Sequence, residues 1–349
     1  MIEDVCLIIP AYNPEEKLFL DFLEQATKHF TNIIVVNDGS KEECEVVFSK
    51  INEIYPKIKI LKHSVNLGKG RALKTAYNVY LSEYLNCIGM VQADCDGQHC
   101  IDDVVNCAKT LREHQNVLVL GVRDFNSKDV PPKSKFGNKI TRIIFKIFIG
   151  ISIKDTQTGL RAIGNENLKK FVATKGERYE YETNVLIDCK SDNIEIMEVP
   201  IKTIYIEKNH TSKFNPIKDS FTIYKLFGKY IFASLSAFVI DIILFNVMML
   251  IFMKIQIDNK IIYSTIIARI ISSLYNFRIN AKMVFKNMNS DSFIKYVVLV
   301  IIQMLVSAFS VNMLSKAIPI NATVIKIVVD LIIFMINFVV QREIVFKNK

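Results

Sequence analysis

The chain has 349 residues, half of them hydrophobic, and a formal net charge of +9. Residues 227–349 contain 13 Lys and Arg against 5 Asp and Glu, whereas residues 1–226 contain 31 against 30. The excess positive charge therefore belongs to the apolar half, where basic residues flank membrane segments, and this argues against nucleic-acid binding. The length leaves room for two domains, which we place at 1–226 and 227–349.

The seven cysteines all lie in the first part of the chain and form no Cys-x-x-Cys pair. This argues against a zinc site and is typical of reduced cytosolic thiols. The apolar run Val5–Ile9 is too short for a signal peptide and is followed by Pro10, so we expect no secretory signal.

Short β-rich runs alternate with helix-like stretches in residues 1–226. We predict strands at Val5–Ile9, Asn32–Asn37, Lys57–Leu61, Cys87–Ala93 and Val117–Gly121. We predict helices at Glu15–His29, Glu42–Tyr55, Gly70–Leu85 and Asp102–Glu113. Apolar strands that alternate with helices indicate an α/β fold with a mostly parallel sheet. In such sheets ligands bind beyond the carboxyl ends of the strands.

Residues that could bind a ligand or take part in a reaction follow four of these strands. Asp94 and Asp96, one residue apart, can bind one hard cation from one side and leave room for phosphate oxygens. Such a pair is also common in a solvated turn. Lys69 and Gly70 lie at a helix start, which favours phosphate, although an ordinary helix cap would look the same. The remaining segments are Pro10-Ala11-Tyr12-Asn13 and Asp38-Gly39-Ser40.

These segments together resemble family 2 glycosyltransferases of the GT-A fold. The matching motifs are Ile9–Asn13, Val36–Ser40, Asn66–Gly70 and Ala93–His99. The motif Asp155-Thr156-Gln157-Thr158-Gly159-Leu160-Arg161 is similar to the polyprenyl-phosphate branch, which includes dolichyl-phosphate mannose synthases and bactoprenyl-phosphate glucosyltransferases. Departures at Asn37, Pro14 and Cys95 leave the nucleotide base open between uridine and guanosine.

The resemblance implies roles for particular residues. Asp94 and Asp96 would bind Mg²⁺ or Mn²⁺, with Gln98 near the metal, and Arg123 and Asp155 would complete the catalytic set. Residues that would hold the nucleotide sugar are Pro10, Ala11, Tyr12, Asn13, Asp38, Gly39, Ser40, Lys69, Gly70 and Gln98. Residues that would contact the acceptor phosphate are Lys133, Ser134, Lys135, Arg161 and Lys213. His99 and His210 are not expected to be ligands.

Two segments are expected to form helices at a membrane surface, near 134–149 and 215–228. In the first, Lys135, Lys139, Arg142 and Lys146 lie on one helical face, and apolar residues lie beside them. A basic stripe next to an apolar stripe suits an anionic bilayer. A helix packed on the domain core with a solvated basic edge is the alternative.

Four apolar segments near 230–253, 261–280, 294–315 and 318–341 are each about long enough to cross a membrane. An even number of passes puts the front domain and both termini on one side. The excess of Lys and Arg flanking that side predicts that it is cytoplasmic. Asp241, Arg269, Lys326 and Asp330 lie within these segments, either as an ion-pair cluster or as a polar path.

The apolar half also contains a weak internal repeat. The segment from Asn276 to Asn287 is similar to the segment from Asn337 to Asn348, 61 residues later, which suggests two related helix pairs. The pattern resembles the GtrA-like membrane domain over 228–349. That family is associated with lipid-linked sugars.

The sequence thus predicts an integral-membrane enzyme that transfers one sugar from a UDP- or GDP-sugar to polyprenyl phosphate, with inversion. A processive polysaccharide synthase is disfavoured because those relatives use a Gln-x-x-Arg-Trp motif and this chain has no Trp. A lipid-linked sugar flippase or scaffold with an inactive front domain is the alternative. Homo-oligomers are compatible with the pattern.

Overall fold

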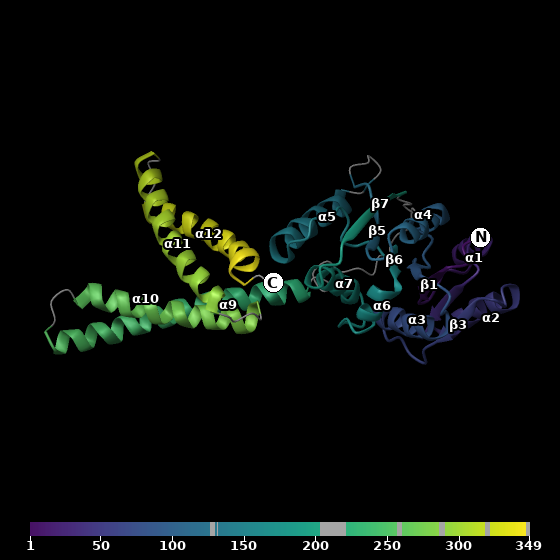
Figure 1. Cartoon of the computed structure of the whole chain (residues 1–349), viewed down its shortest axis with the longest axis horizontal. Coiled ribbons are helices and arrows are strands. Elements are labelled where there is room, and N and C mark those ends of the chain that lie inside the picture. Colours follow the sequence, from purple (N-terminus) through teal and green to yellow (C-terminus); the bar gives the residue numbers. More distant parts are fainter. Residues whose placement is uncertain are drawn as a thin grey trace. The chain divides into compact units, whose positions relative to one another are not determined.

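The computed structural model describes residues 1–125, 130, 132–202, 221–256, 260–285, 290–317 and 322–346. The chain divides into two compact units, Met1–Thr222 and Ile223–Lys349. The first unit is an α/β domain and the second is helical (Figure 1).

The first unit is built on one mixed sheet. Its strands are β1 (Val5–Ala11), β2 (Ile33–Asn37), β3 (Lys59–Lys62), β4 (Gly89–Gln92), β5 (Leu118–Arg123), β6 (Arg161–Gly164) and β7 (Ile196–Ile201). The strand order is β3-β2-β1-β4-β6-β5-β7. Among these strands β6 alone runs antiparallel to its neighbours β4 and β5, so the prediction of a mostly parallel sheet is confirmed.

Helices cover both faces of the sheet. They are α1 (Glu16–His29), α2 (Glu45–Ile54), α3 (Lys69–Glu83), α4 (Ile101–Glu113), α5 (Pro132–Ile144), α6 (Asn165–Val172) and α7 (Glu180–Ser191), with short turns η1 (Glu42–Cys44) and η2 (Phe145–Ile149). Side chains of α1, α2 and α4 share one apolar core with the strands, whereas α3 packs with α6 and α7. Strands β1 and β2 are buried throughout, as parallel strands between two helical layers must be.

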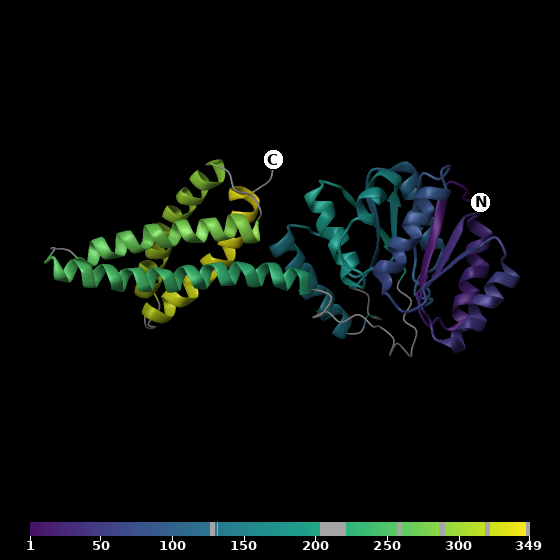
Figure 2. The same cartoon turned by 90° about the horizontal axis from the view of Figure 1, so that it is seen from below.

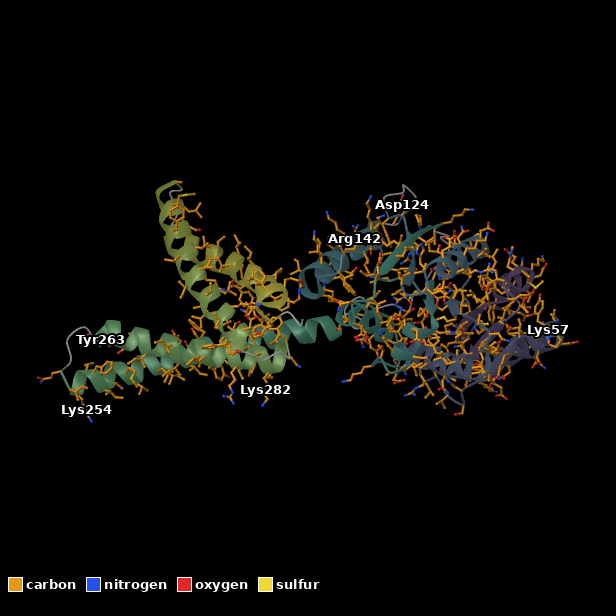
Figure 3. The ribbon with its side chains drawn as sticks, viewed as in Figure 1. Lys57, Asp124, Arg142, Lys254, Tyr263 and Lys282 are labelled. Atoms are coloured by element: carbon orange, nitrogen blue, oxygen red, sulfur yellow. The ribbon has the colours of Figure 1, made fainter. Side chains whose placement is uncertain are left out.

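The second unit contains α9 (Phe221–Lys254), α10 (Lys260–Ile279), α11 (Ser290–Ala317) and α12 (Ala322–Val340). Helices α9 and α10 lie side by side in both views (Figures 1 and 2). Lys254 and Tyr263 lie near one end of this pair and Lys282 near the other (Figure 3). Within the described residues, Gly228–Lys254 is the one helix that is long and apolar enough to cross a membrane. That the chain crosses the membrane four times stays a prediction.

The internal repeat is visible as contacts between equivalent residues. Helices α10 and α12 end in the π-helical turns η3 (Asn280–Val284) and η4 (Gln341–Val345). Asn280 Nδ2 donates to Gln341 Oε1 at 3.2 Å, and these two residues are 61 positions apart. Phe285 stacks on Phe346, its own counterpart, with ring centroids 4.8 Å apart.

Two further ring contacts of this unit are related in the same way. Phe277 meets Phe346 at 5.6 Å, and Phe338 meets Phe285 at 5.8 Å. In the repeat Phe277 corresponds to Phe338 and Phe285 corresponds to Phe346, so exchanging the two copies converts one contact into the other. Residues that touch their own counterparts must lie at the axis that relates the two copies. The internal repeat is therefore visible at η3 and η4, which an approximate two-fold axis relates, whereas the pair of related helix hairpins stays a prediction.

Candidate functional site

The predicted site residues gather at the carboxyl ends of β1, β2 and β4. These strands are parallel neighbours, so the loops that follow them open at the same sheet edge. Pro10 and Ala11 belong to β1 itself and are buried, so they offer no side chain to a ligand. Tyr12, which follows them, is 37% exposed.

The loops after β1 and β2 are tied into one unit. The Asn13 N–H donates to Ser40 Oγ at 2.9 Å, and the Lys41 N–H donates back to Asn13 Oδ1 at 2.8 Å. Asn13 has a φ of 49°, a left-handed conformation that Asn tolerates better than most residues. Gly39 has a φ of +63°, and a Cβ there would lie 2.1 Å from the Val65 carbonyl carbon. Only glycine fits this turn.

Asp38 is 2% exposed, and both oxygens of its carboxylate accept hydrogen bonds from the protein itself. Its Oδ1 accepts from His63 Nδ1 at 2.7 Å and from the Leu67 N–H at 3.0 Å. Its Oδ2 accepts from Asn66 Nδ2 at 3.1 Å and from the Gly68 N–H at 2.8 Å. A carboxylate offers about four lone-pair positions. Asp38 therefore fixes the loop before α3.

Lys69, the first residue of α3, joins two carboxylates. Its Nζ lies 2.7 Å from Asp94 Oδ1 and 3.0 Å from Glu182 Oε2. Burial acts to lower the pKa of Lys69, but the charges of Asp94 and Glu182 outweigh it and raise that pKa. The next residue, Gly70, serves packing, because a Cβ there would lie 2.5 Å from the Tyr181 Cβ.

A histidine also lies beside Asp94. His99 Nε2 lies 3.6 Å from Asp94 Oδ2. Burial alone would raise the pKa of Asp94, yet Lys69 and His99 hold it well below its usual range. A Cβ on Gly159 would lie 2.3 Å from Asp94 Oδ2 and 2.8 Å from Lys69 Nζ, so a side chain at this position would collide with the pair.

Asp96 differs from Asp94 although it is only two residues away. Its Oδ1 accepts the Gln98 N–H at 3.1 Å. Burial and the charge of Asp94 raise the pKa of Asp96. Burial and the two neighbouring carboxylates raise the pKa of the Cys95 thiol to about 12, so it stays protonated.

The donor set at Asp94 and Asp96 fits a hard divalent cation only in part. Among the described residues, no three His, Cys, Asp or Glu side chains are grouped as a metal site would need. Two carboxylates that repel each other favour a cation between them. The remaining ligands would have to be oxygens of a bound molecule.

Arg123 and Asp155 form a bidentate pair. Arg123 Nε lies 2.7 Å from Asp155 Oδ2, and its Nη2 lies 3.1 Å from Oδ1. Asp155 is 0% exposed and also accepts the Gln157 N–H at 3.0 Å. The Arg123 side chain is 25% exposed. Asp155 therefore orients Arg123 and is itself shielded from any ligand.

Helix α5 is anchored to the segment that contains Asp155. Asn138 Nδ2 donates to the Lys154 carbonyl at 2.8 Å, and Thr156 Oγ1 donates to Thr141 Oγ1 at 3.1 Å. On its outer face apolar and basic side chains are exposed together. These are Phe136, Ile140 and Ile143 with Lys135, Lys139, Arg142 and, in η2, Lys146.

The other predicted phosphate contacts differ in their placement. Arg161 is 2% exposed, and it donates to the carbonyls of Thr158 and Glu182, so the structure places it in the core. The side chains of Lys133 and Ser134 lie outside the described residues, as do Lys213 and residues 215–220 of the helix predicted near 215–228. The rest of that predicted helix is observed as the start of α9.

Sequence reasoning missed Glu182, Gln92 and His63. Gln92 Nε2 donates to Glu182 Oε1 at 3.0 Å and to the Gly159 carbonyl at 2.9 Å, and Gln92 Oε1 accepts from the Tyr77 hydroxyl. Gln92 had a signal in the sequence, since it is a polar residue at the end of an otherwise apolar strand. Glu182 had none, because it is one of several acidic residues on α7.

Known family models match both units of the chain. The chain matches the family model "Glycosyl transferase family 2" over residues 6–172 and the model "GtrA/DPMS, transmembrane domain" over residues 229–346. An uncharacterized protein of Methanocaldococcus jannaschii is 32% identical over 235 residues, which cover 66% of this chain and 93% of that protein.

Two named enzymes are also similar to the chain. The UDP-N-acetylglucosamine–dolichyl-phosphate N-acetylglucosaminyltransferase of Methanococcus voltae is 34% identical over 224 residues, covering 58% of this chain and 86% of that enzyme. The human dolichyl-phosphate beta-glucosyltransferase is 25% identical over 227 residues, covering 59% of this chain and 68% of that enzyme.

Proposed function

Because the chain belongs to glycosyl transferase family 2 and carries a GtrA/DPMS transmembrane domain, we propose that this membrane glycosyltransferase moves one sugar from a nucleotide sugar to polyprenyl phosphate. The named relatives are dolichyl-phosphate sugar transferases. The observation that carries the proposal is the Lys69–Asp94–Asp96 cluster at the carboxyl edge of the sheet.

The donor nucleotide is proposed to bind across the tied loops after β1 and β2. Tyr12, Asn13 and Ser40 supply an exposed ring and a fixed backbone, and Gly39 keeps the turn narrow. Asp38 supports this surface indirectly, through the loop that leads to Lys69. UDP is the favoured donor nucleotide, with GDP as the alternative.

Mg²⁺ or Mn²⁺ is proposed as the cofactor, held by Asp94 and Asp96 with Gln98 beside them. When bound, the ion supplies charge neutralisation of the departing nucleoside diphosphate. Lys69, which lies beside Asp94, adds a second positive charge next to the departing diphosphate. The two carboxylates alone form an incomplete ligand set, and donor phosphate oxygens would complete it.

The acceptor phosphate is proposed to bind at Arg123. Its guanidinium is held by a fully buried carboxylate and keeps an exposed edge. Lys133, Ser134, Lys135 and Lys213 are proposed to assist. The exposed apolar and basic face of α5 would lie on the membrane surface and bring a lipid-bound phosphate to this edge.

The reaction needs little acid–base chemistry. A monoalkyl phosphate has its second pKa near about 6, so the acceptor oxygen is already anionic at neutral pH. That oxygen forms a bond to the anomeric carbon while the bond from this carbon to the nucleoside diphosphate breaks. Attack from the opposite face inverts the anomeric centre. The protein contributes position and charge.

The helical unit is proposed to anchor the enzyme with four spans and the catalytic unit on the cytoplasmic side. The apolar helix Gly228–Lys254 and the matching membrane family support the anchor. Basic residues at the ends of α10 and α12 support the orientation, among them Lys282 and Arg342.

The proposal is tested by sugar transfer with the full chain in detergent. Labelled UDP- and GDP-sugars are supplied one at a time with polyprenyl phosphate and Mn²⁺ or Mg²⁺. We expect a labelled lipid from one nucleotide class, lost in Asp96→Asn and dependent on the cation. Absence of product from every donor, with a folded protein that binds polyprenyl phosphate, would favour a carrier or scaffold.

A further inference from the structure

Lys69 is shared between two carboxylates that differ in how they are held. Its Nζ contacts Asp94 at 2.7 Å and Glu182 at 3.0 Å, and the three side chains are 14%, 28% and 13% exposed respectively. Asp94 lies in the loop after β4 and is the most open of the three. Glu182 lies on α7 and is the more enclosed of the two carboxylates.

Glu182 is fixed by a buried chain of hydrogen bonds. Its Oε1 accepts from Gln92 Nε2 at 3.0 Å. Gln92 is 2% exposed and is itself held by the Gly159 carbonyl and the Tyr77 hydroxyl. The carboxylate of Glu182 therefore stays in place whether or not Asp94 keeps its contact with Lys69.

A divalent cation on Asp94 would change the surroundings of Lys69. The ion and the ammonium would compete for one carboxylate and repel each other at short range. A largely buried ammonium without an anionic partner is strongly unfavourable. Glu182 is the one other carboxylate paired with Lys69 among the described residues.

We propose that Glu182 is a positioning residue that retains the Lys69 ammonium beside the donor site when Asp94 binds a cation. The inference rests on the proposed function, since it assumes that Asp94 is a cation ligand. It assigns Lys69 two states: bridging Asp94 and Glu182 in the empty site, and held by Glu182 alone in the loaded site.

This role predicts opposite effects of two substitutions on cation affinity. In Lys69→Met the competitor of the cation is gone, so binding becomes tighter. In Glu182→Gln the displaced ammonium has no partner, so binding becomes weaker. We expect at least about a fivefold change in each direction, the lower end of couplings between neighbouring sites.

The double variant separates this role from a simple loss of negative charge. If Glu182 acts through Lys69, then Glu182→Gln has little effect in the Lys69→Met background. If it acts only through its field on the cation, the weakening persists there. Glu177→Gln is the matched control, because Glu177 pairs with Arg71 and Lys74 of the same helix α3, and among the described residues it forms no ion pair with Lys69.

The experiment measures Mn²⁺ binding to the full chain in detergent, with and without UDP or GDP, from the electron paramagnetic resonance signal of free Mn²⁺. Protection of buried Cys107 from alkylation shows that each variant is folded. Tighter binding in Lys69→Met, weaker binding in Glu182→Gln and no change in Glu177→Gln are expected.

Equal affinity in wild type and Glu182→Gln, a persisting effect in the double variant, or no Mn²⁺ binding in wild type would each overturn the inference. Sugar transfer by the wild type is measured in parallel. Transfer without the predicted binding pattern refutes the role of Glu182 alone, whereas the binding pattern without transfer refutes the proposed function.

Discussion

Removal of Arg123 should destabilise the catalytic unit more than removal of its partner Asp155. Arg123→Ala leaves a carboxylate that is 0% exposed, with only backbone donors such as the Gln157 N–H at 3.0 Å. Breaking a buried pair in this way costs about 3–5 kcal/mol. In Asp155→Ala the remaining guanidinium is 25% exposed and can turn to water. The cost should then fall to about 1–3 kcal/mol, mainly for donors left unpaired.

The double variant gives the sharpest result of this series. With both side chains removed, neither charge of this pair remains, so Arg123→Ala/Asp155→Ala should be more stable than Arg123→Ala alone by more than about 1 kcal/mol. The free energy of unfolding follows from alkylation of buried Cys107 and Cys189 as denaturant is raised, because all cysteines lie in the first part of the chain. Strict additivity, or equal costs for the two single variants, would refute the buried-pair argument.

Three further changes have defined outcomes. Asp38→Asn should lower the free energy of unfolding by about 2–4 kcal/mol in the same alkylation assay, since one replaced oxygen leaves two donors unpaired in a buried site. A smaller loss would show that Asp38 does not hold the loop. Gly159→Ala should reduce sugar transfer with little loss of stability, because its Cβ would lie 2.3 Å from the flexible end of Asp94; unchanged kcat and KM would contradict this. Burial raises the pKa of Cys107 and Cys189 to about 12, so these thiols of the native protein should resist alkylation at pH 8. Their thiolates should form only as the pH approaches this pKa. Unfolding in urea should restore rapid labelling at pH 8.

The sequence predicted the regular part of the fold well because periodicity and motif order are local signals. The strand predicted at Val5–Ile9 is observed as Val5–Ala11, and the helix predicted at Glu15–His29 as Glu16–His29. The antiparallel strand β6 (Arg161–Gly164) was not predicted. It is only four residues long, so it has too few alternations to show a period.

The site was predicted as a set of residues but not as a set of contacts. Asp38 and Asp155 were expected to face ligands, yet both carboxylates are occupied by protein donors. Arg161 was expected at a phosphate and lies in the core. A charged residue in a motif looks the same in a sequence whether it touches a ligand or supports one that does. Glu182 shows the converse, since only the packing of α7 on α3 brings it to Lys69.

The most direct test of the central claim is the identity of the two products formed from an unlabelled donor and polyprenyl phosphate. Mass spectrometry of the lipid and chromatography of the nucleotide are performed on the same reaction. Transfer of a single sugar predicts a lipid heavier by one glycosyl residue with one phosphorus, and release of a nucleoside diphosphate. A lipid with two phosphorus atoms and release of a nucleoside monophosphate, or a lipid with several sugars, would contradict it.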